Sequence, residues 1–246
     1  MMTTARQAPV CHVLEEDAGL GESVQESRRG QAVDECTARC VNIPTGRWQW
    51  KDAADPDALG LLVLNGMLIR KVAIDGRSGA ELVGEGDVLR PWQEDAEPAT
   101  LRATSEWRVL APARVAVLDG QFTRLIGRYP ELGCCLMSRA IQRSRHLTVN
   151  MAIVHQARVD VRLHMVLWHL AARWGRVRGD GVTVPIRLTH TTLADLVAAR
   201  RPTVTTALRE LSRRGVARTV EDGWLLTGQP PGEFVRISHS SIQTAA

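Results

Sequence analysis

The sequence has no run of 18 apolar residues, and its N-terminus lacks the basic-then-apolar order of a secretion signal. A helix that crosses a membrane needs about 20 such residues, so neither a membrane span nor export is expected. Cysteines are few, and their number, five, is odd. Scattered thiols of this kind fit reduced cysteines in a reducing compartment better than a disulfide framework. We therefore expect a cytoplasmic protein without a membrane partner.

No paired C-x-x-C motif of a zinc site occurs, so we expect no metal and no other cofactor. One alternative stays open: Cys36 and Cys40 lie four residues apart in a segment able to form a helix, where they would share a face and hold a metal or cluster with Cys11. This set lacks a clear fourth ligand. The adjacent Cys134 and Cys135 point in different directions on a helix and fit core or interface packing.

The chain of 246 residues is long enough for two domains, each with its own core. Its net charge of +4 is compatible with a polyanionic partner and does not establish one. Of its 31 basic residues 29 are arginine, which suggests base composition of the genome, so arginine content alone fits a solvated surface equally well. The local order of residues has to decide between these interpretations.

Near the C-terminus, the sequence predicts two short helices around a tight turn. Thr189 is able to cap a helix over residues 190–198, in which apolar residues recur at helical spacing. Residues 198–200 then form a three-residue turn. Pro202 marks the start of a second helix near 201–214, because proline is tolerated only in a first helical turn.

The second helix carries an apolar stripe, Val204, Leu208 and Leu211, that is expected to pack on the first helix. Its other face, with nearby positions, offers hydrogen-bond donors suited to phosphates and base edges in a DNA major groove. We expect Arg201 to read a base and Arg200, Thr203 and Arg209 to hold phosphates. The full predicted DNA-binding set is Thr189, His190, Arg200, Arg201, Thr203, Thr205, Thr206, Arg209 and Arg218.

A short hairpin follows Gly215, with Asp222-Gly223 at its turn and Arg218 as a contact to the DNA backbone. A third strand is expected over residues 182–187, at a sheet edge because it contains Pro185. Cap, turn, proline, stripe and hairpin in this order favour a winged helix-turn-helix that binds double-stranded DNA.

Residues 61–118 contain short apolar runs separated by turn pairs, among them Asn65-Gly66 and Asp75-Gly76, at about ten-residue spacing. This pattern predicts an antiparallel β-roll of about seven or eight strands. The expected fold class is α+β, in four parts. They are a poorly ordered or loosely helical segment (1–40), the roll (41–128), a long dimerisation helix (129–158) and the winged helix-turn-helix (159–246).

Pro130 opens the long helix, whose apolar stripe makes it a candidate seam of a homodimer. The stripe consists of Leu132, Leu136, Ala140, Leu147, Met151 and Val154. Packing of this helix on its own roll alone is the alternative. A two-fold dimer is favoured because two recognition helices one DNA turn apart read a palindrome better than one.

The order of roll, proline-initiated long helix and C-terminal winged helix-turn-helix resembles the Crp/Fnr family of bacterial transcription regulators over about residues 60–228. The family's residues recur at Thr189, Leu193-Ala194, Leu196-Val197, Arg201, Thr203-Val204, Leu208 and Leu211. The resemblance implies a homodimer that binds near promoters and contacts RNA polymerase. Pro202 and Thr206 stand where DNA-reading members often carry Glu and Arg, and Ala198 occupies a turn position often held by glycine.

The same resemblance bears on the effector. Nucleotide-responsive members carry Gly-Glu and then Arg-Ser or Arg-Thr, whereas here Gly86-Asp87 leads to Arg90-Pro91-Trp92 and the acidic residues Glu94, Asp95 and Glu97. These carboxylates would repel a cyclic phosphate, so we expect a degenerate sensor with an unknown small-molecule effector, and no iron-sulfur cluster of the Fnr kind. The alternative is a cyclic-nucleotide-responsive regulator in which Arg90 or Arg102 holds the phosphate.

Two further function classes, an enzyme and an adaptor, make different predictions. Cys134 and His146 are residue types that could act as a nucleophile and a base. Twelve helical residues separate them by about 18 Å along the helix axis, so they cannot meet within one chain and we expect no enzyme. An adaptor that keeps the fold without binding DNA is separated from a regulator by the salt dependence of its binding to random duplex.

Overall fold

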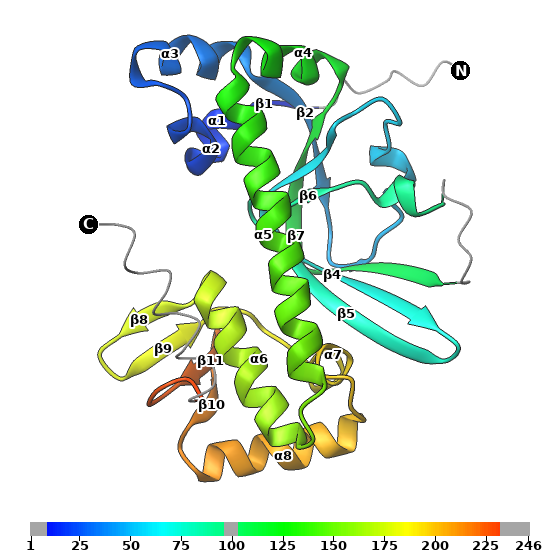
Figure 1. Ribbon diagram of the computed structural model, residues 1–246, viewed down its shortest axis with the longest axis vertical. Helices are drawn as coiled ribbons and strands as arrows, with labels where there is room; N and C mark the ends of the chain where they lie inside the picture. Colours follow the sequence, from blue (N-terminus) through cyan, green and yellow to red (C-terminus); the bar gives the residue numbers. More distant parts are fainter. Residues whose placement is uncertain (1–8, 96–102, 232–246) are drawn as a thin grey trace. The chain divides into compact units, whose positions relative to one another are not determined.

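The computed structural model describes residues 9–95 and 103–231, which belong to two compact units, residues 1–145 and 146–246 (Figure 1). Its elements confirm the α+β class, with an antiparallel roll in the first unit and a winged helix-turn-helix in the second. None of the described helices has the length and apolar character that crossing a bilayer requires.

The first unit runs, in chain order, through β1 (Val10–His12), α1 (Val13–Glu16), α2 (Ala18–Glu22), α3 (Glu26–Glu35), β2 (Thr37–Ile43), β3 (Gly46–Arg47), the 3-10 helix η1 (Trp50–Ala53), β4 (Gly60–Ile74), β5 (Arg77–Gly84), β6 (Val88–Leu89), η2 (Pro91–Asp95), β7 (Thr104–Leu118), α4 (Gly120–Arg128) and α5 (Pro130–Val154), which continues into the second unit. The second unit adds α6 (Val159–Trp174), β8 (Arg176–Arg178), β9 (Gly181–Val184), α7 (His190–Leu196), α8 (Arg201–Arg213), β10 (Ala217–Val220) and β11 (Gly223–Leu226).

The sheet of the first unit is antiparallel in the order β1-β2-β7-β4-β5, with β3 on β7 and β6 on β4. The strands β4 and β7 are long, and each contains two of the short apolar runs that the sequence predicts as separate strands. Asn65-Gly66 is a bulge inside β4 rather than a hairpin turn, because Gly66 has φ +92° and lies against β7. A Cβ on Gly66 would approach the Cα of Ala113 to 2.4 Å, so only glycine fits this close approach.

The turn chemistry is confirmed elsewhere in the roll. Asp75 and Gly76 both have positive φ and join β4 to β5 as a two-residue hairpin. In the next turn the Asp87 carboxylate accepts a hydrogen bond from the backbone N–H of Gly84 at 2.8 Å. Asp87 is therefore a buried turn residue whose side chain is bound by the backbone of Gly84.

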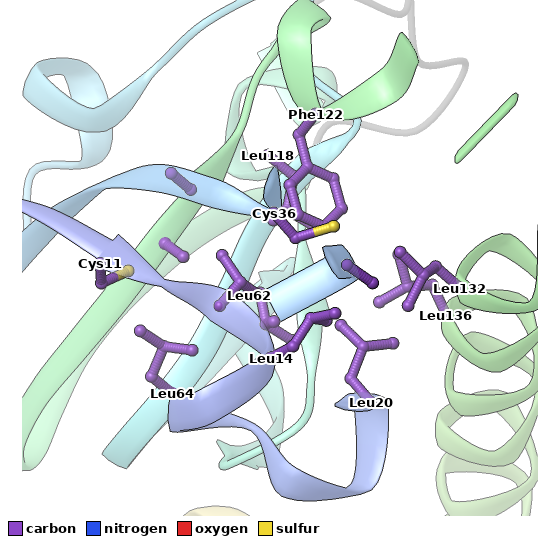
Figure 2. Packing of buried hydrophobic residues seen from close by; sticks show 14 of the residues in the cluster. Cys11, Leu14, Leu20, Cys36, Leu62, Leu64, Leu118, Phe122, Leu132 and Leu136 are labelled. Atoms are coloured by element: carbon purple, nitrogen blue, oxygen red, sulfur yellow. The ribbon is translucent and has the colours of Figure 1, made fainter. Parts of the chain in front are cut away.

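The N-terminal segment differs from its prediction. Residues 10–43 form β1, α1 to α3 and β2, and contribute Val13, Leu14 and Leu20 to a core shared with the sheet (Figure 2). The sequence predicts a poorly ordered or loosely helical segment over residues 1–40, and the described part of this segment contains three short helices that bury apolar side chains with little periodicity in the sequence. Residues 1–8 lie outside the described part of the chain.

Two of the cysteines are paired. Cys11 on β1 and Cys40 on β2 form a disulfide with a Cα–Cα separation of 6.2 Å, within the usual range for such bonds. The expectation of five reduced thiols is wrong for this pair, since pairing of β1 with β2 brings together residues that lie 29 apart. Cys36 is a free thiol buried in the core near Phe122, and among the described residues the ligand atoms that lie within 4.8 Å of one another belong to Cys11, Glu16 and Cys40, without Cys36.

The sheet of the second unit has the order β10-β11-β9-β8. The predicted edge strand is internal, because β9 ends at Val184, before Pro185, and β8 pairs with its free side. Residues 176–178 form that extra strand, β8. Gly223 opens β11 with φ +152°, where a Cβ would lie 2.1 Å from the carbonyl oxygen of Val184.

Candidate DNA-binding surface

The first helix of the helix-turn-helix begins where the sequence predicts it. The Thr189 hydroxyl accepts a hydrogen bond from the backbone N–H of Thr192 at 3.1 Å and so caps α7. The helix ends at Leu196 instead of residue 198, because Ala198 has φ +49°, in the left-handed region that interrupts an α-helix. The turn position often held by glycine thus has the conformation that favours glycine.

The second helix, α8, begins after Arg200, whose backbone is extended, and has Pro202 in its first turn. Val204, Leu208 and Leu211 are buried, as the apolar stripe predicts, and Ala207 joins them. This face packs on α6 and α7. The opposite face of α8 therefore projects away from the core of the second unit.

An arginine that sequence reasoning missed holds the turn. Arg162 of α6 donates hydrogen bonds to the carbonyl oxygens of Val197 at 3.2 Å and Ala198 at 3.3 Å. These carbonyls lie at the C-terminal end of α7, where a cation compensates unpaired acceptors. The available signal was an arginine in the first half of a helix with many apolar residues.

The outer face of the helix-turn-helix exposes Arg200, Arg201, Thr203 and Arg209. In the described part of the chain, no hydrogen bond or ion pair engages the guanidinium of Arg200, Arg201 or Arg209. By contrast, Arg213, on the last turn of α8, pairs with Glu210 at 2.8 Å. Among the described arginines of α8 and its two caps, Arg200, Arg201 and Arg209 are therefore the ones left available to an external anion, since Arg214 lies 3.6 Å from Asp160.

The remaining polar residues of the predicted set make internal contacts. The Thr205 hydroxyl lies 2.9 Å from Nδ1 of His190 and donates to the backbone oxygen of Arg201 at 3.1 Å, so Thr205 and His190 link α8 to α7. Thr206 donates to the carbonyl of Pro202 at 3.3 Å. Thr189 is engaged as the cap. These four side chains therefore stabilise the helix-turn-helix through internal hydrogen bonds, which leaves less of their hydrogen-bonding capacity for DNA.

The wing consists of β10 and β11. Arg218 is exposed and lies 3.8 Å from Asp180, while Arg187, which sequence reasoning did not single out, lies 3.2 Å from Asp222 at the wing tip. Both pairs are largely solvent-exposed, and exposed pairs contribute little, about 0–1 kcal/mol. A phosphate is able to replace either carboxylate at small cost.

The predicted dimer stripe divides into two sets. Leu132 and Leu136 are buried in the core of their own roll, where they point toward Leu20 (Figure 2), so they have little surface left for a partner. Ala140, Leu147 and Met151 are exposed and Val154 is half-buried. The structure adds two exposed apolar residues on α5 that the stripe missed, Met137 and Ile141.

Arg90, which would hold the phosphate under the cyclic-nucleotide alternative, makes contacts within the roll. Arg90 donates to the carbonyl oxygen of Pro56 at 3.2 Å, and its guanidinium lies 6.0 Å from the ring of Trp92. Arg139 and Arg143 of α5 bind the carboxylates of Asp17 and Glu81. Arg102 and the acidic side chains of Glu94, Asp95 and Glu97 lie outside the part of the chain that the structure describes.

Comparison with known proteins agrees with this geometry. The Crp-like helix-turn-helix domain matches residues 161–227. Two Mycobacterium tuberculosis proteins, each described as a CRP-like cAMP-activated global transcriptional regulator, are 28% identical over 181 residues, 72% of this chain and 79% of theirs.

Solved structures share the fold at low identity. A cyclic nucleotide-binding domain containing protein from Listeria monocytogenes EGD-e has a TM-score of 0.64 at 14% identity, over 85% of this chain and 96% of that one. A CooA mutant from Carboxydothermus hydrogenoformans has a TM-score of 0.61 at 14% identity, over 97% and 98%.

A Crp-like helix-turn-helix in which Arg200, Arg201 and Arg209 have no partner among the described residues fits a DNA-binding transcription regulator, and the roll that precedes it shares the fold of a cyclic nucleotide-binding domain. Residues 161–227 thus match the helix-turn-helix domain of Crp-like regulators, and over 72% of its length the chain is similar to CRP-like regulators, so it resembles the Crp/Fnr family. Members of this family bind DNA and typically act as dimers, and the relatives found are regulators rather than enzymes.

Proposed function

We propose that the protein acts as a homodimer whose two α8 helices enter major grooves one turn apart on a palindromic site. Arg201 reads a base, Arg200, Thr203 and Arg209 hold phosphates, and Arg218 contacts the backbone from the wing. The observation that carries the proposal is the set of exposed arginines on the outer face of α8 and at its N-cap, Arg200, Arg201 and Arg209, which have no internal partner among the described residues. An arginine that donates twice to guanine contributes roughly 1–3 kcal/mol of discrimination.

The exposed apolar residues of α5 support the dimer. Met137 and Met151 are each 62% exposed, and Ile141 and Leu147 lie between them at spacings close to a heptad repeat. Pairing two such helices would cover this surface and place the reading helices about 34 Å apart. By family resemblance, the DNA-bound dimer also contacts RNA polymerase.

Internal ion pairs support a sensor that does not use a cyclic nucleotide. Glu81 is 9% exposed and receives two hydrogen bonds from Arg143, at 2.7 and 3.2 Å, while Arg143 also donates to the carbonyl of Val88. The carboxylate of Glu81 in the roll is thus the anion that the Arg143 guanidinium of α5 binds. The second candidate is a cAMP-responsive regulator, as the name of the Mycobacterium relatives indicates for them.

Three arginine variants of one helix test the DNA-reading roles, on a site selected from random duplexes and on random DNA. Arg201→Ala is expected to remove about 1–3 kcal/mol of preference for the selected site. Arg209→Ala is expected to weaken both duplexes alike and to lower the salt slope by about one. Arg213→Ala is the matched control, because Arg213 is already paired with Glu210.

Equal losses on selected and random DNA for both variants would contradict these roles, and no binding to any duplex at low salt would refute the function. For the dimer, Met137→Glu is expected to shift sedimentation toward monomer, with the exposed neighbour Ser138→Glu as control. Calorimetry with cAMP tests the sensor, and tight stoichiometric binding would favour the second candidate.

A further inference from the structure

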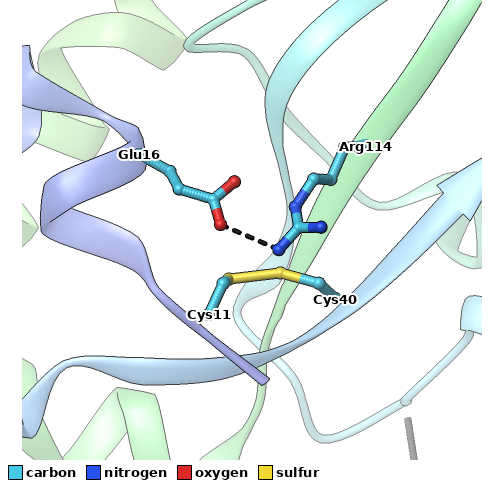
Figure 3. Close-up of a disulfide and its surroundings, with 4 residues drawn as sticks. All are labelled: Cys11, Glu16, Cys40 and Arg114. Atoms are coloured by element: carbon cyan, nitrogen blue, oxygen red, sulfur yellow. Dashed lines mark hydrogen bonds and ion pairs between the residues drawn. A yellow bond between two sulfur atoms is a disulfide. The ribbon is translucent and has the colours of Figure 1, made fainter. Parts of the chain in front are cut away.

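The Cys11–Cys40 disulfide lies at the edge of the first unit's sheet (Figure 3). Both sulfurs are buried, with Cys11 4% and Cys40 1% exposed. Strand β1 has only three paired positions, and its first residue, Val10, is 66% exposed. Opening this short edge strand is the simplest way for a reagent to reach the sulfurs.

A protein that works on the chromosome shares the reducing compartment of DNA. Disulfides there are rare, and those that occur are usually transient, catalytic or redox-sensing. Cys36 does not compete with the pair, because burial raises its pKa to about 11 and leaves it a protonated thiol. Cys134 and Cys135 lie on α5, outside this edge.

The disulfide is placed where it controls a contact to α5. β1 continues directly into α1 and then into Asp17, which caps α2. The Asp17 carboxylate receives two hydrogen bonds from Arg139 of α5, at 2.5 and 2.8 Å, and only 6% of Asp17 is exposed. Beside the sulfurs, Glu16 of α1 pairs with Arg114 of β7 at 2.8 Å (Figure 3).

We propose that Cys11 and Cys40 form a thiol–disulfide switch that sets how firmly the β1–α2 segment anchors α5 and, through α5, the affinity for DNA. The consequence for DNA rests on the proposed function. In the oxidised state the covalent bond holds β1 on β2 and keeps Asp17 on Arg139. In the reduced state only the short strand pairing and the core contacts of α1 hold the segment.

The chemistry balances with two named reagent classes. A dithiol reductant attacks the bond through one thiolate and releases Cys11 and Cys40 as thiols, while its own sulfurs form a disulfide; two electrons and two protons pass to the protein. In the reverse direction one thiolate attacks hydrogen peroxide, yielding a sulfenic acid and hydroxide, which becomes water on protonation. The other thiolate then displaces the sulfenic oxygen as a second hydroxide, likewise protonated to water, and the disulfide forms.

The test uses the full chain reduced with dithiothreitol or oxidised with hydrogen peroxide, with thiols counted by alkylation and mass spectrometry. We expect reduction to accelerate hydrogen exchange in residues 10–22 and 130–145, and to weaken DNA binding about fivefold or more. Cys40→Ser should behave as the reduced protein under both conditions. Cys134→Ser, which removes an exposed unpaired thiol, should respond like the natural chain.

Equal exchange and equal DNA affinity in the two states would overturn the proposal. The exchange measurement needs no variant and no DNA, so it decides whether the disulfide anchors α5 even if the protein binds no duplex. A failure to bind any duplex would refute only the proposed function. Since Cys11, Glu16 and Cys40 also offer ligand atoms within 4.8 Å of one another, the reduced protein is titrated with Co²⁺. A thiolate–cobalt absorption band that Cys40→Ser abolishes would overturn the switch in favour of a metal site.

Discussion

Asp17→Asn should destabilise the first unit by about 3 kcal/mol. The carboxylate and the Arg139 guanidinium form a two-bond pair in which Asp17 is 6% and the Arg139 side chain 21% exposed. Removing one partner of a buried pair costs about 3–5 kcal/mol, and the partial exposure of Arg139 favours the lower end. Asparagine keeps an oxygen for the backbone N–H of Leu20 but turns an N–H donor toward Arg139.

Scanning calorimetry measures this loss. In a unit of 145 residues each kcal/mol corresponds to about 2–4 °C, so the transition of the first unit should fall by roughly 10 °C while that of the second stays in place. Asp17→Ala should lose about 1 kcal/mol more, because it also removes the cap of α2. Asp34→Asn is the matched control, as Asp34 is exposed, and it should change stability by less than about 0.5 kcal/mol.

A double-mutant cycle with Arg139→Gln isolates the pair from other effects of each change. If the two residues interact as the structure places them, their coupling energy should exceed about 1 kcal/mol. A coupling below about 0.5 kcal/mol would refute the reasoning, since the losses in the single variants would then arise elsewhere.

Three further predictions concern the second unit. Burial, with the charge of His146 as a second cause, lowers the pKa of His169 to about 4, so between pH 6.5 and 4 the unfolded chain binds this proton and the folded chain does not. The unfolding free energy measured by urea titration should therefore fall by about 2 kcal/mol from pH 7 to pH 5. The variant His169→Gln should lack this pH dependence. Ala198→Gly should raise the unfolding free energy by about 0.5–1 kcal/mol, because the strain that glycine relieves at the left-handed backbone exceeds the conformational entropy that it adds to the unfolded chain. An unchanged or lower urea midpoint of unfolding would contradict this strain. Gly223→Ala should cost more than about 2 kcal/mol by pushing β11 from β9, and a thermal transition like that of the natural chain would show that the hairpin adapts freely.

Short-range chemistry made the helix-turn-helix predictable. The hydroxyl of Thr189 caps a helix through its own backbone neighbours, and Pro202 is compatible with a helix only in its first turn. The Asp75-Gly76 hairpin likewise depends on the conformations of two adjacent residues. Each of these features uses contacts within a few residues, so the order of amino acids was enough to place it.

Contacts within a few residues along the chain could not predict which surface side chains bind other parts of the protein. Thr205 and Arg209 look equally available on a helical wheel, yet Thr205 lies against His190 from another helix while Arg209 is exposed. The same holds for α5, which has apolar residues on two sides: only packing against the roll decides that Leu132 is inside and Met137 outside.

Amino-acid order by itself determined the α+β class, the helix-turn-helix and the resemblance to Crp-like regulators, because these depend on local conformational preferences and on their succession along the chain. Tertiary structure decided that Asn65-Gly66 is a bulge, that Cys11 meets Cys40 and that Asp17 binds Arg139. Those features join residues far apart in the chain, and pairwise proximity of this kind arises only when strands and helices have packed around a common core.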